Sequence, residues 1–188
     1  MIVLGIDGSL TCTGFAVITT DGVPGSERII YTERMHTSPE DGTDVYRARN
    51  LAARALGLAK EYDAELIGLE MPYVDQRKAG DVGLRLARLG GAFEQALEGG
   101  GFEVVQVAAA SAGKALGIKG RNTLRAEKKR QAIANVRTRY GLTVTDDEAD
   151  AIGVALAAVV TQRKSTHGKQ SRMKLPAQRR GKEASSDE

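Results

Sequence analysis

Short apolar runs rich in β-branched residues open the chain and indicate β-strands. One runs from Ile2 to Asp7, a second from Thr13 to Ile18 and a third from Arg28 to Met35. Turn-forming residues separate them, at residues 8–9 and again at residues 21–25. Because these connections are short, the pattern predicts that three antiparallel strands begin the fold.

Helical and strand-like patterns alternate over the next hundred residues. Two stretches have helical spacing of apolar residues, from Asp41 to about Tyr62 and from Gly80 to about Leu97. Short apolar strands follow each of them, Glu65 to Glu70 and Phe102 to Val107, and a basic helix runs from about Thr123 to Tyr140. Since strand–helix–strand crossovers join parallel strands, we expect an α/β fold with a five-stranded mixed sheet, three strands antiparallel and then two parallel, flanked by helices.

Two of the predicted strands end on an acid, which a fold alone does not require. Asp7 closes the first strand and Glu70 closes the fourth. Alternation places Asp7 on the same sheet face as Val3 and Gly5. If the first and fourth strands are parallel neighbours, the two carboxylates lie side by side at one edge of the sheet. The simpler alternative for Asp7 is an aspartate that starts a turn and caps its own backbone.

A further group of acids begins the most apolar stretch of the chain, residues 151–160. Thr145 and Glu148 fit a capping box, which gives part of this acidity a structural explanation. Asp147 and Asp150, three residues apart, instead begin a stripe that continues through apolar residues, and the stretch is apolar on both sides. We therefore expect a buried helix whose first carboxylates point into packed protein, where they need a partner such as a metal ion.

Four acids thus converge in this interpretation: Asp7, Glu70, Asp147 and Asp150. Donor sets made only of carboxylates select hard cations, so Mg²⁺ is expected, with Mn²⁺ as a substitute. Two such ions per site can stabilise both the attacking and the leaving oxygen of a phosphodiester. A basic block from Lys114 to Arg139 contains a single acid, Glu127. The combination predicts metal and phosphate chemistry together, as in a hydrolytic nuclease.

Composition narrows the protein class further. The chain has 188 residues, of which 41% are hydrophobic, enough for one domain with a real core. Its only cysteine, Cys12, excludes an internal disulfide and suits a reducing compartment, and two histidines are too few for a zinc site. The start shows no secretory leader pattern, and the longest apolar run is half of what crosses a bilayer. We expect a cytoplasmic protein with no membrane partner.

The order of elements and the position of the acids resemble the RNase H-like superfamily, and most closely the RuvC-type Holliday junction resolvases, over about residues 1–160. The opening GIDGSLTCTGFAV aligns without gaps with that family's glycine-isoleucine-aspartate, leucine and threonine-glycine pattern. The DEADA ending at Ala151 matches its D-x-x-D-A helix start. The resemblance implies an RNase H-like nuclease domain over residues 1–162. Residues 163–188 match nothing in the family pattern, and their content of Lys, Arg, Ser and Gln predicts a basic, disordered tail.

The resemblance also assigns roles. It makes the four acids the metal ligands, and AASAGK and RAEKK place Lys114 and Lys128 at the positions of its catalytic lysines. Tyr73 matches the aromatic residue that wedges into the junction centre in that family. The alternative is that its side chain only packs in the hydrophobic core. Lys128 could equally be one solvated charge among its neighbours. The remaining expected DNA contacts lie in the basic block: Lys119, Arg121, Arg125 and Lys129.

Together these features predict a magnesium-dependent endonuclease that resolves four-way junctions by symmetric paired nicks. A small-residue stripe at Gly83, Ala87 and Gly91 packs on the sheet or on a second copy, and the resemblance favours a homodimer. Three alternatives remain open. They are a nuclease of this fold acting on RNA, flaps or other branches, a non-catalytic junction-binding protein, and a sugar-kinase or actin-like ATPase, which would need a second domain.

Overall fold

In the computed structural model, residues 1–71, 80–120 and 123–172 are described, the last eight of them as backbone only. A five-stranded sheet forms the centre, in the order β3-β2-β1-β4-β5. The β1–β2 and β2–β3 pairs are antiparallel, whereas β1–β4 and β4–β5 are parallel. The predicted fold class is therefore confirmed. The strands are β1 (Ile2–Asp7), β2 (Cys12–Thr19), β3 (Arg28–His36), β4 (Leu66–Glu70) and β5 (Val104–Val107).

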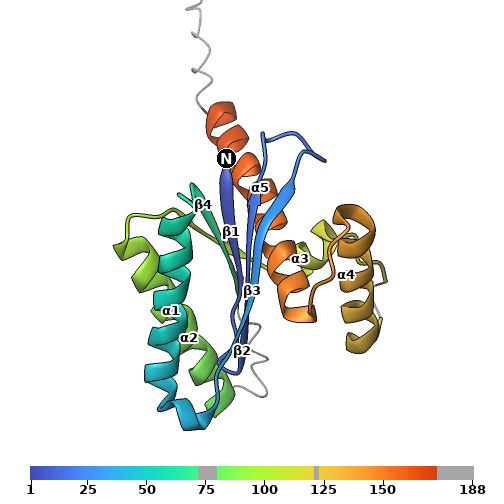
Figure 1. The fold of residues 1–188 in the computed structure, drawn as a ribbon. Coiled ribbons are helices and arrows are strands. Elements are labelled where there is room, and N and C mark those ends of the chain that lie inside the picture. The colour runs from blue at the N-terminus through green and yellow to red at the C-terminus, as the bar shows by residue number, and fades with distance from the viewer. Residues whose placement is uncertain (72–79, 121–122, 173–188) are drawn as a thin grey trace, which may run out of the picture.

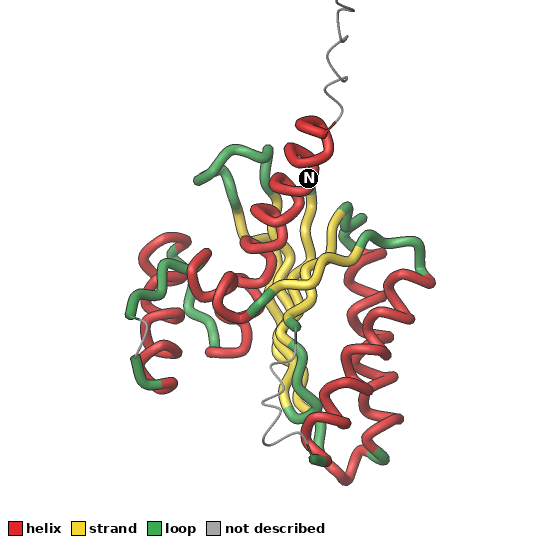
Figure 2. The backbone as a smooth tube through the Cα atoms, turned by 180° about the vertical axis from the view of Figure 1, so that it is seen from behind, coloured by secondary structure: helices red, strands yellow, loops and turns green. Residues whose placement is uncertain are grey.

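Helices cover both faces of this sheet, as Figures 1 and 2 show from opposite sides. One face carries α1 (Asp44–Glu61) and α2 (Asp81–Gly99), and a short 3-10 helix, η1 (Pro39–Asp41), leads into α1. The other face carries α5 (Asp146–Arg172), with α3 (Ala109–Ala115) and α4 (Arg125–Tyr140) outside it. The sheet is thus the middle layer of three.

Alternation along the strands divides the apolar residues between two cores. In β1, Leu4 and Ile6 pack with α1 and α2, whereas Val3 packs with α5. All three side chains are fully buried. The α5 residues from Ala149 to Val159 are almost all buried, because the sheet lies on one side of the helix and α3 and α4 lie on the other. This explains the helix that is apolar all round.

Three glycines let α5 lie directly on the sheet. A Cβ atom at Gly14 of β2 would lie 2.0 Å from the Asp147 carbonyl oxygen, and one at Gly5 of β1 would lie 2.2 Å from the Ala151 carbonyl oxygen. At Gly68 of β4 the nearest atom would be the Ala158 Cβ, at 2.8 Å. Real Cβ atoms do not approach other atoms so closely, so the helix backbone occupies the space that side chains would need.

Two elements differ from the sequence-based expectation. The small-residue segment after β5 forms α3, and α5 continues past residue 162 to Arg172, so the first part of the expected tail is helical. The proposed division at residues 162 and 163 stays a prediction. Tyr73 and Arg121 lie outside the described residues. No helix in the described part of the chain is both long and apolar enough to cross a bilayer.

Candidate active site

The register of the sheet brings the two strand-end acids together. Strands β1 and β4 pair in parallel, with Gly5 opposite Gly68 and Ile6 opposite Leu69. The next residues along the two strands are Asp7 and Glu70, and each shares the α5-facing side with the glycine two positions before it. The sheet-edge arrangement expected from the sequence is therefore present, at the lower end of the sheet in Figure 1.

Helix α5 begins at the same edge. Its start is fixed by the predicted capping box, in which Glu148 accepts hydrogen bonds from the Thr145 backbone N–H at 2.8 Å and hydroxyl at 2.7 Å. Close packing on Gly14 sets Asp147 above β2, and Gly14 is the β2 partner of Asp7. The first turn of α5 thus delivers its acids to the place where β1 and β4 end.

The pKa values show that these carboxylates crowd one another. Burial, followed by the charges of Glu70, Asp150 and Asp147, raises the pKa of Asp7 to about 8. Burial and the Asp150 charge raise the pKa of Glu70 to about 7. Burial also raises the pKa of Asp150 to about 6, against the opposing effect of Lys129. Three acids whose pKa values are raised to between about 6 and about 8 mark a buried site with more negative charge than its surroundings neutralise.

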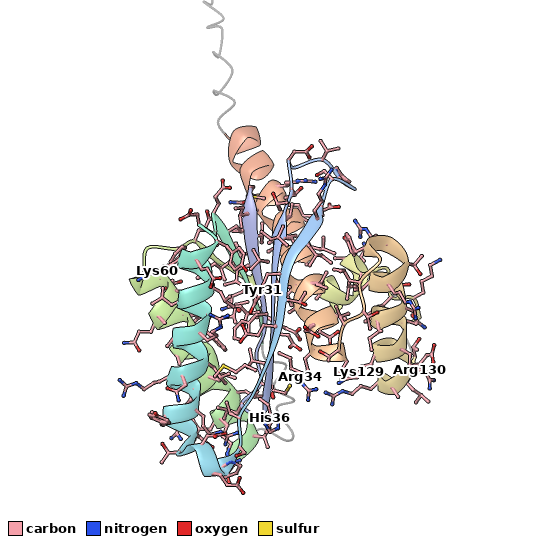
Figure 3. All side chains as sticks on the ribbon, viewed as in Figure 1. Tyr31, Arg34, His36, Lys60, Lys129 and Arg130 are labelled. Atoms are coloured by element: carbon pink, nitrogen blue, oxygen red, sulfur yellow. The ribbon has the colours of Figure 1, made fainter. Side chains whose placement is uncertain are left out.

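Cations from two sides partly neutralise this site. Lys129 of α4 forms an ion pair with Asp146, and this contact raises the pKa of Lys129 and lowers that of Asp146. From β3, Arg34 Nε lies 3.3 Å from Asp147 Oδ2. The Cys12 thiol donates a hydrogen bond to the same oxygen, with an Sγ–Oδ2 distance of 2.8 Å. Figure 3 shows Arg34 and Lys129 on facing elements, with the start of α5 between them.

A buried arginine holds the turn that follows Asp7. The Arg47 side chain of α1 is only 5% exposed. It donates hydrogen bonds from Nη2 to the Leu10 carbonyl at 2.8 Å and from Nε to the Thr37 hydroxyl at 3.0 Å. Asp44 pairs with it at 3.2 Å and also with Arg85 of α2, at 3.0 Å. This network fixes the β1–β2 turn beside the acids.

Comparison with solved structures identifies the fold. The structure of Thermus thermophilus RuvC matches 88% of this chain and 98% of its own, with a TM-score of 0.70 and 24% sequence identity. This chain has the fold of the RuvC-type resolvases. T. thermophilus RuvC in complex with a Holliday junction substrate matches over the same shares, with a TM-score of 0.70 and 22% identity. The yeast mitochondrial Holliday junction resolvase Ydc2 matches 90% of this chain and 82% of its own, with a TM-score of 0.57 and 14% identity.

No protein-family model and no curated protein sequence matches the chain. The RuvC fold is thus evident from the structure. At 22–24% identity, the roles of the site residues depend on the geometry and charge of this chain.

The charge balance of the site fits a divalent cation. Within residues 1–71, 80–120 and 123–172, no group of three or more acidic, histidine or cysteine side chains is already arranged as a metal site. The acids at the start of α5 are instead turned toward Lys129, Arg34 and Cys12. Burial and the charges of neighbouring acids raise the pKa values of Asp7, Glu70 and Asp150, and such carboxylate oxygens are the donors that Mg²⁺ or Mn²⁺ prefers. Asp7, Glu70, Asp147 and Asp150 would hold it.

The basic residues predicted to bind DNA differ in their exposure and in their contacts with the acids. Lys114 and Lys119 are exposed, on α3 and on the loop after it, and Arg125 is exposed at the start of α4. Lys128 is half-buried on α4, whereas its neighbour Lys129 makes the ion pair at the acids. Of these two lysines, Lys129 is the one that contacts an acid at the start of α5, and the role of either lysine stays a prediction.

Arg34 was missed by sequence reasoning. It lies in an edge strand whose polar residues look like ordinary surface, with Glu33 before it and His36 two positions later. Only the β2–β3 register, in which Gly14 is opposite Arg34, shows that it is beside the acids. The signal in the sequence would have been its register. In the three predicted antiparallel strands, Arg34 of the third strand lies in the same row as Asp7 of the first.

Proposed function

We propose that this protein is a structure-selective DNA endonuclease that resolves four-way junctions by symmetric paired nicks. The observation that carries the proposal is the convergence of Asp7, Glu70, Asp147 and Asp150 at one end of a RuvC-fold sheet, with pKa values raised in three of them. Solved structures of this fold include one bound to a Holliday junction substrate. The cofactor of the proposal is Mg²⁺, two ions per site, with Mn²⁺ able to replace it.

Each residue of the site would have a distinct role in phosphodiester hydrolysis. When bound, the cation supplies the Lewis acidity that activates a water molecule and neutralises the reacting phosphate. Asp7 and Glu70, on paired strands, and Asp150, on a helix packed against them, give the ligand set a rigid frame. Lys129 places a positive charge next to the phosphate and stabilises the charge that develops in the transition state. Hydrolysis would leave a 5′-phosphate and a 3′-hydroxyl.

The DNA-binding part of the proposal concerns the basic side of the molecule. Phosphates would contact α3, α4 and the loop between them, which makes binding sensitive to salt. The residues proposed for these contacts are Lys114, Lys119, Arg121, Arg125, Lys128 and Lys129, with Tyr73 as the wedge at the junction centre. A cytoplasmic location also belongs to the proposal, in keeping with a single unpaired thiol.

Two copies are needed for paired nicks, and α2 offers the contact. Leu84, in its first turn, is 52% exposed and shares a helix face with Ala87 and Gly91. Of the predicted small-residue stripe, Ala87 and Gly91 are exposed, whereas Gly83 is buried within the protomer. We propose that this exposed apolar face of α2 forms a two-fold contact in a homodimer, so that the symmetry of the protein matches that of the junction.

Cleavage of a substrate panel tests the function. End-labelled four-way junction, flap, duplex and RNA–DNA hybrid are incubated with protein in Mg²⁺, beside Asp150→Asn and beside Asp21→Asn. Asp21 is a matched control because it is an exposed acid at the opposite end of the sheet. We expect paired symmetric nicks on the junction alone, lost in Asp150→Asn and kept in Asp21→Asn.

Other outcomes would redirect the proposal. Cleavage of the RNA–DNA hybrid or the flap, and not of the junction, would support the acids as the catalytic site and identify a different substrate. Tight junction binding without cleavage by the wild-type protein would identify a junction-binding protein instead of a nuclease.

A further inference from the structure

Arg34 lies in line with the first acid of the candidate site. Asp7 of β1 pairs with Gly14 of β2, and Gly14 pairs with Arg34 of β3. Residues directly opposite each other in antiparallel strands project to the same face. Asp7 and Arg34 therefore share one row across the sheet on the α5 side, with Gly14 between them and the first turn of α5 packed on that glycine. Figure 3 shows the Arg34 side chain leaving β3 toward the start of α5.

The guanidinium keeps most of its binding capacity in this position. Its contacts within the described part of the chain both use Nε, which lies 2.8 Å from Cys12 Sγ and 3.3 Å from Asp147 Oδ2. An arginine carries five N–H donors in a planar fork, so both terminal NH₂ groups remain for a ligand. The side chain is 46% exposed. Ion pairs with this exposure contribute little to stability, so a stronger anionic partner can replace Asp147 at the guanidinium.

The opposite side of the site carries a matching charge. Lys129 of α4 pairs with Asp146, one residue before the Arg34 partner Asp147. The two ion pairs thus lie on either side of the start of α5, one on the sheet side and one on the α4 side. An anionic backbone that crosses the acids between them would meet a cation on both sides. Arginine suits this task because its fork matches the geometry of phosphate oxygens.

We propose that Arg34 binds a DNA phosphate next to the scissile one and forms, with Lys129, a two-sided clamp that holds the strand over the acids. The inference rests on the proposed nuclease function and adds to it a strand-positioning residue on β3, outside the basic block. In the free protein the same guanidinium is held by Asp147 and Cys12, and the DNA phosphate replaces these partners.

Junction binding by Arg34→Ala, compared with Arg28→Ala, tests the proposal. Arg28 is on the same strand and is also exposed, but it lies six residues away, about 20 Å along the strand, and the bulge opposite Val17 and Ile18 places it on the other face of the sheet. Fluorescence anisotropy of a labelled four-way junction is measured in metal-free buffer, where cleavage does not consume the substrate, over a range of salt concentrations. Binding of Mn²⁺ to the DNA-free proteins is measured by calorimetry, and circular dichroism checks that each variant is folded.

We expect Arg34→Ala to weaken junction binding about three- to tenfold at low salt and to lower the slope of log K against log salt by about 0.9 per lost phosphate contact. Arg28→Ala should bind like wild type. The Mn²⁺ affinity of Arg34→Ala should be equal or higher, because a competing positive charge beside Asp147 has gone. Arg34→Lys, which keeps the charge, should retain the wild-type salt slope.

Two results would overturn the inference. One is junction binding by Arg34→Ala that equals that of Arg28→Ala. The other is a joint loss of DNA and Mn²⁺ binding, which would make Arg34 a structural support for Asp147. The proposed function fails separately, through absence of junction cleavage by the wild-type protein, so the two failures are distinguishable.

Discussion

Asp7 carries the largest pKa increase at the site, and this has a consequence for stability. The ordinary pKa of an aspartate is 3.8, and in the folded protein it is about 8. Between these values the folded state keeps a proton that the unfolded chain has lost. Folding therefore becomes less favourable as pH rises from about 4 to about 8, in the absence of bound cations. Glu70 and Asp150, with pKa values of about 7 and 6, act in the same direction.

Replacement of Asp7 by Asn should therefore stabilise the ion-free protein while it abolishes cleavage. We expect a gain of about 1–3 kcal/mol at pH 8 and almost none at pH 4, since each pKa unit corresponds to about 1.4 kcal/mol and the acids share the repulsion. Thermal denaturation in chelator at both pH values measures this. The control Asp21→Asn should leave the pH dependence in place. A destabilised Asp7→Asn protein at pH 8 would show that the carboxylate has a structural role.

Lys129 and Lys128 are neighbours whose surroundings differ. Lys129 faces Asp146, and its charge lowers the pKa of both Asp7 and Asp150. We expect Lys129→Ala to slow single-turnover junction cleavage by about 10- to 100-fold. Its pH–rate profile should move to higher pH, because the acids lose a charge that helps them ionise. Lys128→Ala should have the smaller effect, and the reverse order would support the assignment from the sequence motif.

The candidate acids stand out in the sequence because most of them interrupt an apolar pattern, and their role as metal ligands stays a prediction. Asp7 and Glu70 end apolar strands, and Asp150 begins an apolar helix. Their partners could not be predicted in this way. The contact of Asp147 with Arg34 and Cys12 depends on how α5 is seated on β2 and β3, which are more than a hundred residues away in the chain. The packing of a helix on distant strands leaves no periodic pattern in the sequence of the helix or of the strands.

At the level of elements, the contact between α5 and the sheet is the most demanding feature of the fold. A methyl group at Gly14 would meet the Asp147 carbonyl oxygen at 2.0 Å, so either the helix or the strand must move. We expect Gly14→Ala to cost about 1–3 kcal/mol of unfolding free energy and to impair cleavage, because the displaced atoms belong to a site residue. Urea denaturation and the junction assay measure the two effects.

A matched glycine gives the control. Gly57 lies on the exposed side of α1, and a Cβ atom there would meet no other atom within 4 Å. Gly57→Ala should be neutral or stabilising by up to about 1 kcal/mol, since alanine favours helices. Equal effects of the two substitutions would argue against tight seating of α5.

The strands and long helices followed from the periodicity of apolar residues, and their expected ends lie within a few residues of those in the structure. The exceptions have physical causes. Helix α3 consists of small residues without an amphipathic stripe, so the pattern gave no signal for it. Helix α5 continues into a polar, basic stretch because helical propagation from a buried segment requires no further apolar contact.

At the level of the whole molecule, the proposed homodimer predicts how the two nicks are linked. A charge at the exposed Ala87 on α2 should separate the protomers, whereas the same change at the exposed Ala53 on α1 should not. We expect Ala87→Glu to sediment as a monomer and to lose paired cleavage, with residual single nicks at most. Dimeric Ala87→Glu with paired nicks would place the two-fold contact on another surface.

The Cys12 thiol gives the molecule a built-in attachment point for a spectroscopic label. The chain contains one cysteine, and its sulfur lies 2.8 Å from Asp147 Oδ2, so a fluorescent or fluorinated reagent would mark the candidate site without protein engineering. Burial and the bond to Asp147 raise the pKa of this thiol, so labelling should be slow at neutral pH and faster in alkaline buffer. A reporter at this atom would record the arrival of DNA or a cation as it occurs.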